Sequence, residues 1–332
     1  MALQAVDHPN ARSSHSAPVV RGGGIAIVLV LLAGIALLGN TLLPGSGTLM
    51  LTVLGLAVVS FVDDLRTLGP AIRLGCHLAA AVVVIAVLNL AQVTLGLGAD
   101  YLHSAPWILG WPLAVLWIAG YTNAFNFMDG INGIAGGQAA ITGIGMAVLA
   151  NLAGGQFDSP PIMWCLALAG AALGFLPHNF PRARMFMGDV GSAPIGFLLA
   201  VLTLWLAKVV GLWLLVPLAL LHANFVLDTA ITLGRRVFRG DRWLDAHREH
   251  FYQRLNRAGH GHPMITGLEM ALQALVLALM VLYLRASPPL RVALSSLVIL
   301  IWLAFFAFCE WSLRKSDIVP PAGAKLVESP GK

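Results

Sequence analysis

Two adjacent aspartates, Asp63 and Asp64, end a long apolar stretch that begins near Thr48. Negative charge is unfavourable at the C-terminus of a helix, and two neighbouring carboxylates also repel each other. A divalent cation would offset both effects, because Mg²⁺ binds to carboxylate oxygens. The alternative is a solvated helix end that pairs with Arg66. The aspartate pair predicts a metal site with a catalytic role.

A second group of polar residues lies in the sequence NAFNFMDGINGIAGG, where Asn123, Asn126 and Asp129 are spaced by three. At a helix end, this spacing places neighbouring members on one face. Amides both donate and accept hydrogen bonds, so they suit sugar hydroxyls or a nucleobase. The alternative is an Asn/Gly-rich loop with a capping aspartate. We expect Asn123 and Asn126 to bind substrate and Asp129 to be catalytic.

A fourth acid, Asp189, stands between two glycines in the sequence MGDVGS. Such a turn can present backbone N–H groups to an anion while the aspartate holds a metal. Upstream, Asn179 is a further candidate for substrate binding, and Arg182 and Arg184 could pair with phosphate. The alternative is a tight loop with arginines that flank the membrane. The pattern predicts that Asp189 is catalytic and a metal ligand.

A histidine- and arginine-rich segment, LDAHREHFYQRLNRAGHGH, covers residues 244–262. A zinc site is a poor match, because no Cys or Glu stands at ligand spacing. Phosphate binding fits better, so we expect the segment to contact a pyrophosphate substrate through His247, Arg248, His250 and Arg254. The alternative is a basic loop that touches anionic lipid.

One further acid, Asp228, is expected inside an apolar span, where an ionisable residue is a functional candidate by default. Its alternative role is an ion pair with Arg235 or Arg236. Three other charged residues are interpreted as lying at the membrane interface: Lys208, Glu269 and Glu310.

These residues belong to a very apolar chain of 332 residues, with a mean hydropathy of +0.83 and 11% charged residues. Soluble domains carry about 25% charged residues. Runs of roughly 18 to 22 apolar residues recur, each long enough to cross a bilayer as a helix. The sequence predicts an all-α polytopic membrane protein with about ten transmembrane helices. The expected spans are 23–43, 47–62, 71–91, 106–122, 133–152, 161–178, 192–209, 211–231, 267–285 and 289–313.

The basic residues are distributed unevenly between the two sides of the predicted membrane. If the spans alternate, 17 of the 20 Lys and Arg fall on one side, and the other three are Lys208, Arg285 and Arg291. The positive-inside rule makes this side cytoplasmic, together with both termini. Nearly all the polar candidates fall on the same side, so we expect active-site loops in the cytoplasm. Because the basic residues lie in short loops between spans, the pI near 9.4 does not indicate nucleic-acid binding.

The chain is expected to form one integral membrane domain. A cytoplasmic segment, 1–22, precedes eight spans over 23–231; a long cytoplasmic loop, 232–266, precedes two spans over 267–313 and a tail over 314–332. A transporter or flippase would place charges near span centres and use broken helices at the midplane. A non-catalytic lipid-binding scaffold gives no reason for four acids that face one region. The pattern favours an enzyme that works at one membrane surface.

Five sequence blocks resemble, in this order, those of the polyprenyl-phosphate N-acetylhexosamine-1-phosphate transferases, bacterial glycosyltransferase family 4. They are HPNARSSHSAPVVRGGG, FVDDLRTLGPAIRL, NAFNFMDGINGIAGG, NFPRARMFMGDVGS and the His/Arg segment, within residues 7–262. The second block adds Arg73 to the expected substrate-binding residues. Two features depart from the family. First, a span normally precedes the first block, so this chain is expected to start late or to lack that helix. Second, the family's common His-x-His-His motif is reduced here to His250 followed by FYQ.

The resemblance implies a reaction. A UDP-N-acetylhexosamine-type donor would give its sugar-1-phosphate to undecaprenyl phosphate, a membrane lipid, and UMP would leave. Phosphoryl transfer needs positioning and charge neutralisation. Mg²⁺, with Mn²⁺ as a substitute, is therefore expected at Asp189, Asp63 and Asp64, because few fixed cations are expected between these acids. The donor sugar stays open among GlcNAc, GalNAc, FucNAc and QuiNAc.

Within the family, the sequence AHREHFYQRL looks closer to the bacterial enzymes that start O-antigen or related surface glycans. The alternative is the phospho-N-acetylmuramoyl-pentapeptide transferase of peptidoglycan synthesis, which has a denser histidine cluster. The resemblance also implies the bacterial inner membrane and allows a homodimer.

Overall fold

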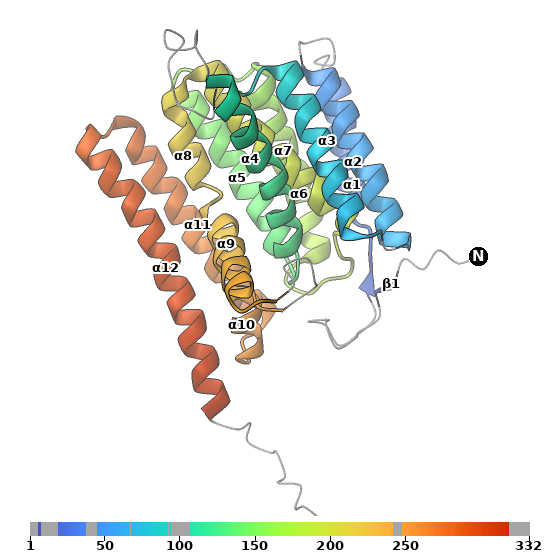
Figure 1. Ribbon diagram of the computed structural model, residues 1–332, viewed down its shortest axis with the longest axis vertical. Helices are drawn as coiled ribbons and strands as arrows, with labels where there is room; N and C mark the ends of the chain where they lie inside the picture. Colours follow the sequence, from blue (N-terminus) through green and yellow to red (C-terminus); the bar gives the residue numbers. More distant parts are fainter. Residues whose placement is uncertain are drawn as a thin grey trace, which may run out of the picture.

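The computed structural model describes residues 6–7, 19–37, 45–66, 68–91, 93, 106–241 and 248–318. Over these residues the chain is a bundle of long helices that run back and forth between two ends (Figure 1), so the expected all-α polytopic fold is confirmed. A short antiparallel strand pair, β1 (Val6–Asp7) with β2 (Val19–Val20), precedes the bundle. The helices are α1 (Gly24–Leu37), α2 (Ser46–Arg66), α3 (Pro70–Leu88), α4 (Pro106–Met128), α5 (Ile134–Leu152), α6 (Pro160–Asn179), α7 (Asp189–Val210), η4 (Leu212–Leu214), α8 (Leu215–Leu220), α9 (Ala223–Phe238), α10 (Phe251–Arg257), α11 (His262–Arg285) and α12 (Pro288–Ile318).

Seven of the described helices are long and apolar enough to cross a membrane, and the broken pair of η4–α8 with α9 makes an eighth span if it is counted as one. Each of the ten expected spans coincides with a helix or with this pair, but the ends differ. α1 has only 14 residues, whereas α2 continues to Arg66 and α4 to Met128. The polar segment expected over 232–266 is also partly helical, because α9 extends into it, α10 lies within it and α11 begins in it.

The expected span 211–231 is not one straight helix. Its two halves meet at a bend of 68°. At the break, the carbonyl oxygen of Leu221 accepts hydrogen bonds from the side-chain amides of Gln138 (3.1 Å) and Gln273 (2.6 Å). A backbone carbonyl without a partner is costly in an apolar interior. Two buried glutamines from α5 and α11 therefore stabilise the bend, and hydropathy alone does not reveal such partners.

α7 is the central helix of the bundle. Every residue from Val190 to Ala207 is buried. α2 and α4 make the most extensive contacts with it. Because neighbouring helices enclose α7, they also hold its N-terminal residue, Asp189, at a fixed position.

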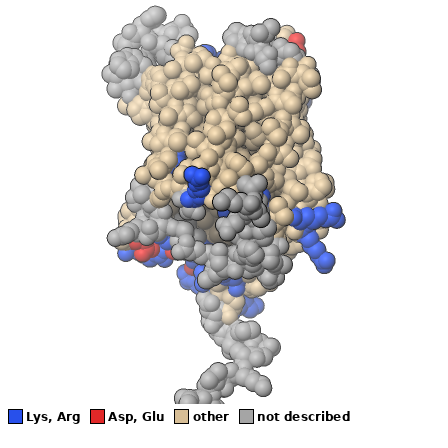
Figure 2. Space-filling model, turned by 90° about the vertical axis from the view of Figure 1, so that its right-hand side faces the viewer, with Lys and Arg blue, Asp and Glu red and all other residues tan. Residues whose placement is uncertain are grey.

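One end of the bundle collects the polar residues. There α2, α4 and α6 end and α3, α5 and α7 begin, and we call it the polar end. Figure 2 shows most of the visible Lys and Arg side chains near this end, which is the lower one, and a broad uncharged band above them. The expected gathering of charge on one side of the predicted membrane therefore agrees with the order of the helices.

The first turns of α1 and α7 approach each other very closely. A Cβ atom built on Gly24 would lie 2.3 Å from the Cα atom of Gly191, which leaves no room for a methyl group. Gly24→Ala should therefore push the helices apart and lower the free energy of unfolding by about 1–3 kcal/mol. The control is Gly34→Ala on the same helix, where a Cβ would meet no atom within 4 Å. Thermal melting in detergent tests both variants, and an unchanged Tm for Gly24→Ala would contradict this packing.

Candidate active site

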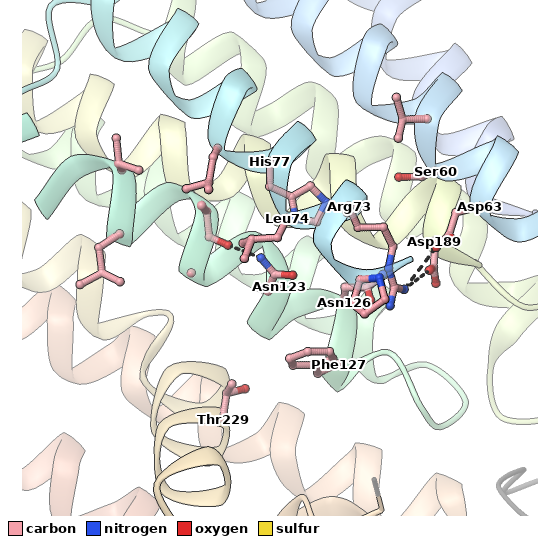
Figure 3. A pocket seen from close by; sticks show the side chains of 18 of the residues that line it. Ser60, Asp63, Arg73, Leu74, His77, Asn123, Asn126, Phe127, Asp189 and Thr229 are labelled. Carbon is pink, nitrogen blue, oxygen red and sulfur yellow. Dashed lines mark hydrogen bonds and ion pairs between the residues drawn. The ribbon is translucent and has the colours of Figure 1, made fainter. Parts of the chain in front are cut away.

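Three of the four expected acids lie together at the polar end. Asp63 and Asp64 come from the last turn of α2, and Asp189 begins α7. Arg21 lies 3.1 Å from Asp64 Oδ1 and 3.1 Å from Asp189 Oδ1. Arg73 Nη1 lies 3.2 Å from Asp63 Oδ2 and 3.4 Å from Asp189 Oδ2 (Figure 3). The expectation that few fixed cations lie between these acids is therefore wrong.

Asp64 has a structural role that its sequence context did not indicate. Its two carboxylate oxygens accept hydrogen bonds from the backbone N–H groups of Asp189 (3.2 Å) and Val190 (3.0 Å). These N–H groups open α7, so Asp64 caps that helix from α2 and meets the positive end of its dipole. Gly188 permits this approach, because it has φ +75° and a Cβ there would lie 2.9 Å from Asp64 Oδ2. The anion that these N–H groups bind is therefore a carboxylate of the protein itself.

Asp63 and Asp189 fit a magnesium site of the kind that a substrate completes. Both contact the same guanidinium nitrogen of Arg73, so the two carboxylates already share one positive charge. Mg²⁺ in proteins is usually held by one or two carboxylates, several waters and substrate phosphates. Within the part of the chain that the structure describes, no three His, Cys, Asp or Glu side chains form a ready-made metal site. This geometry fits two protein ligands, Asp63 and Asp189. Only one oxygen of Asp63 accepts from a backbone N–H, that of Leu68, whereas the α7 backbone engages both oxygens of Asp64.

Asp129 follows the end of α4 in a turn that other helices hold in place. Side chains from three other helices form hydrogen bonds with the backbone of this turn. Tyr252 of α10 donates to the Phe127 carbonyl (3.1 Å), and Thr266 of α11 donates to the Asn132 carbonyl (2.7 Å). Asn179 of α6 accepts from the Gly133 N–H (2.6 Å). Asn179, which we expected to bind substrate, is thus buried and tied to the protein backbone. The structure uses it to position the Asp129 turn.

The Asp129 carboxyl group has an unusual protonation equilibrium. Asp129 is half-buried, in the turn between α4 and α5. Burial raises its pKa, and the negative charges of Asp189 and Asp64 raise it further, against the opposing effect of Arg21. The resulting pKa of Asp129 is about 7. This group can therefore exchange a proton near neutral pH, which an ordinary aspartate cannot do.

A cavity of about 340 Å³ lies beside these acids, between α2, α3, α4 and α9. Asp63, Arg73 and Asp189 line it together, as Figure 3 shows. Asn123 and Asn126 also line it, with Asn123 Nδ2 donating to the Ala119 carbonyl (2.7 Å) and Asn126 Nδ2 to Ser192 Oγ (2.8 Å), and their binding of substrate stays a prediction. Most of the remaining wall is apolar and is formed by Val59, Leu74, Leu78, Val115, Leu116, Ala119, Phe127 and Leu233. A charged region that continues into an apolar wall suits an amphiphilic ligand.

The His/Arg segment approaches the cavity through His250. Its Nδ1 lies 2.8 Å from Asp228 Oδ1, and the N–H of Phe251 donates to the other Asp228 oxygen (2.9 Å). The His250 ring centroid lies 6.1 Å from that of Phe127, which lines the cavity. Asp228 therefore orients His250, and its alternative pairing with an arginine of α9 is wrong.

The other expected residues of this segment are placed differently. His247 lies outside the described residues, and Arg248 is half-buried ahead of α10. Arg254 donates to Glu310 Oε2 of α12 (3.0 Å) and to the carbonyl oxygen of Glu249 (2.8 Å). The structure therefore uses Arg254 to hold α10 against α12 and does not bring it to the acids.

Three residues that shape the site were not singled out from the sequence: Arg21, His77 and Tyr252. His77 lines the cavity and follows Arg73 by four residues, so helical spacing could have placed both on one face of α3. Arg21 pairs with Asp64 and Asp189, and Tyr252 donates to the Phe127 carbonyl. These partners are distant in sequence, so no local sequence pattern indicates them. Glu269 was expected at the membrane interface but is buried in α11.

The two aspartates of α2 should respond differently to the same substitution. Asp64→Asn would turn an N–H donor toward a backbone N–H of α7 that cannot move away, so it should cost about 1–3 kcal/mol of stability. In Asp63→Asn the amide oxygen can still accept from the Leu68 N–H, and its NH₂ group would face the side chain of Arg73, which can move, so the Tm should fall less. Thermal melting in detergent tests this, and an equal loss of Tm in both variants would refute the capping role of Asp64.

Comparison with known proteins connects this geometry to a family. Residues 47–207, which contain all four acids, match the family model of glycosyl transferase family 4. The chain is 31% identical over 291 residues to the probable undecaprenyl-phosphate N-acetylglucosaminyl 1-phosphate transferase of Bacillus subtilis, a match that covers 83% of this chain and 78% of the relative. It is 30% identical over 290 residues to the decaprenyl-phosphate N-acetylglucosaminephosphotransferase of Mycobacterium tuberculosis, over 78% of this chain and 71% of the relative.

A shorter match links the chain to peptidoglycan synthesis. It is 39% identical over 142 residues to the phospho-N-acetylmuramoyl-pentapeptide-transferase of a Synechococcus strain, over 40% of this chain and 38% of the relative. The long matches cover most of the helical bundle, and the shorter one covers less than half of the chain. The chain therefore belongs to glycosyl transferase family 4, the family of polyprenyl-phosphate hexosamine-1-phosphate transferases.

Proposed function

We propose that this protein transfers N-acetylglucosamine-1-phosphate, or a close N-acetylhexosamine equivalent, from a UDP-sugar to undecaprenyl phosphate. The main support is the cavity in which Asp63, Asp189 and Arg73 adjoin an apolar wall. A polyprenyl phosphate has the same division, because it carries a charged phosphate on a long apolar chain. The two relatives that match over most of their length are, by their names, transferases that use undecaprenyl phosphate or decaprenyl phosphate.

The acceptor phosphate would lie near Arg73, with the first isoprenoid units against the apolar wall. Arginine suits this role, because its planar guanidinium matches the geometry of phosphate oxygens. Arg21 would contact the phosphates of the donor in the same way. In the protein alone, both arginines neutralise the acids, so substrate phosphates would compete with carboxylates for them.

The proposed chemistry is a displacement at the β-phosphorus of the donor. A phosphate oxygen of the acceptor forms the new bond, the bond from the β-phosphorus to the bridging oxygen breaks, and UMP leaves. Mg²⁺ bound by Asp63 and Asp189 would neutralise charge on the phosphates. Asp129, with its pKa of about 7, would accept the proton that the acceptor monoester still partly carries near neutral pH.

The donor pyrophosphate would lie toward α10. We propose Arg248 and His250 as its contacts, and His250 has the stronger support because Asp228 orients it beside Phe127 of the cavity wall. Arg254 would act mainly by keeping α10 in place, since Glu310 and Glu249 hold its guanidinium.

We place the protein in the bacterial inner membrane with the polar end in the cytoplasm. The uneven distribution of Lys and Arg between the two sides supports this orientation. The proposed biological role is the first membrane step of O-antigen or related surface-polysaccharide synthesis. The peptidoglycan alternative has less support, because the matches to such transferases cover 40–49% of this chain.

The direct test is a transfer assay with purified protein in detergent. Undecaprenyl phosphate and UDP-GlcNAc with Mg²⁺ should yield undecaprenyl-diphosphate-GlcNAc, identified by mass spectrometry of the lipid fraction. UDP-GalNAc, UDP-FucNAc, UDP-QuiNAc and UDP-MurNAc-pentapeptide serve as competing donors. The absence of a lipid-linked sugar with every donor would refute the proposal, and selective use of the pentapeptide donor would support the peptidoglycan alternative.

Removal of the metal or of one ligand should stop this transfer. EDTA should abolish turnover, and Asp189→Asn should lower kcat by orders of magnitude, because two phosphate-bearing substrates then meet without a neutralising ion. Asp158→Asn, an exposed acid at the opposite end of the bundle, is the control and should behave like the wild type. Full turnover in EDTA would show that the carboxylates do not act through a metal.

The raised pKa of Asp129 predicts a pH profile. Below pH 7 this carboxyl group is mostly protonated and cannot accept a proton, so kcat/KM should rise with pH, reach half its maximum at about pH 7 and level off at higher pH. Asp129→Asn should lower kcat/KM and leave only the ionisation of the acceptor phosphate, near about pH 6. Initial rates between acid and mildly alkaline pH test this. The same apparent pKa in both proteins would exclude Asp129 as the titrating group.

A further inference from the structure

A second cavity lies on the opposite side of α9 from the candidate active site. Thr229 and Leu233 of α9 line the first cavity, whereas Ile231 and Arg235 line the second, which has a volume of about 430 Å³. Residues two positions apart point about 200° apart around a helix. α9 therefore separates two cavities, and the second is a groove between α9, α10 and α12, which lie near one another in Figure 1.

The rim of this groove carries excess positive charge. Glu310 Oε2 pairs with Arg235 (3.4 Å) and Arg254 (3.0 Å), and Glu310 Oε1 pairs with Arg314 (3.4 Å). One carboxylate thus meets three guanidiniums. Arg254 is largely enclosed and also contacts Glu249, whereas the side chains of Arg235 and Arg314 are 43% and 75% exposed. The exposed pair leaves the groove complementary to an anion.

The floor and the open side of the groove are apolar. Phe251 and Phe306 stack in it, with ring centroids 4.4 Å apart. Leu303 and Trp311 line it and are exposed, and Leu300 continues the exposed apolar surface one turn further along α12. Tryptophan and arginine at the end of an apolar span are typical of the depth of lipid headgroups.

We propose that this groove binds an acidic phospholipid, with the lipid phosphate between Arg235 and Arg314 and an acyl chain along Leu303 and Leu300. Charge selects this occupant, because a zwitterionic lipid would leave the excess guanidinium charge uncompensated. The bound lipid would contact α9, α10 and α12 at once. Phe251 follows His250 directly, so the site would also stabilise the helix that begins next to His250. Lipid binding at this groove is independent of the proposed reaction and can be measured without turnover.

The test uses the full-length protein, incorporated into nanodiscs of phosphatidylcholine with phosphatidylglycerol or with phosphatidylethanolamine, then released and analysed by native mass spectrometry. Wild-type protein should retain phosphatidylglycerol in preference to the other two lipids. Arg235→Gln with Arg314→Gln should lower this preference roughly tenfold, because two charge-assisted contacts are lost. The matched control, Arg257→Gln with Arg285→Gln, removes the same charge from two exposed arginines outside the groove and should keep the preference.

A second variant keeps all charges and fills the groove. Ala307 lines it and is exposed, so Ala307→Trp should fold normally and reduce lipid retention. Equal retention of phosphatidylethanolamine and phosphatidylglycerol by the wild type would overturn the proposal. So would undiminished retention of phosphatidylglycerol by Ala307→Trp. Displacement of phosphatidylglycerol by equimolar undecaprenyl phosphate would also overturn it, because it would assign the groove to the acceptor.

Discussion

The hydrogen bonds from the first N–H groups of α7 to the carboxylate of Asp64 are the contact on which the site depends. They join the end of α2 to the start of the most enclosed helix of the bundle. α7 brings Asp189 to this junction, and α2 brings Asp63. A carboxylate that would be unfavourable at the end of its own helix is stabilised by the dipole of another helix. The two remaining aspartates are thereby placed within reach of one guanidinium.

Charge balance at this junction explains why arginines occupy it. Three carboxylates at the edge of an apolar bundle would be strongly unfavourable without partners, because desolvation penalises uncompensated charge. Arg21 and Arg73 provide the partners, and each bridges two acids. Such a cluster is assembled before substrate arrives, yet each arginine can exchange a carboxylate for a phosphate. Phosphoryl transfer depends on this kind of positioning and neutralisation more than on a strong base.

The break before α9 sets the direction of this helix, and α9 lines one cavity on each of two opposite faces. Gln138 and Gln273 satisfy the carbonyl of Leu221 and so allow α9 to leave the direction of α8. In its bent position, α9 presents Thr229 and Leu233 to the candidate active site and Arg235 to the groove beside α12. Asp228, between these faces, binds both the side chain of His250 and the backbone of Phe251. One broken span thereby connects the active-site cavity, α10 and the groove.

The sequence by itself determined the all-α membrane architecture, the approximate positions of the helices and the end at which the polar residues gather, because hydropathy and the alternation of spans are local properties. It also marked Asp63, Asp189, Asn123 and Asn126, which line one cavity. Only the tertiary structure decided that Asp64 caps α7, that Arg21 and Arg73 bridge the acids, that Asn179 holds a turn and that Arg254 pairs with Glu310. These roles come from contacts between residues up to 168 positions apart, and a side chain acquires such a partner only when packing brings two helices together.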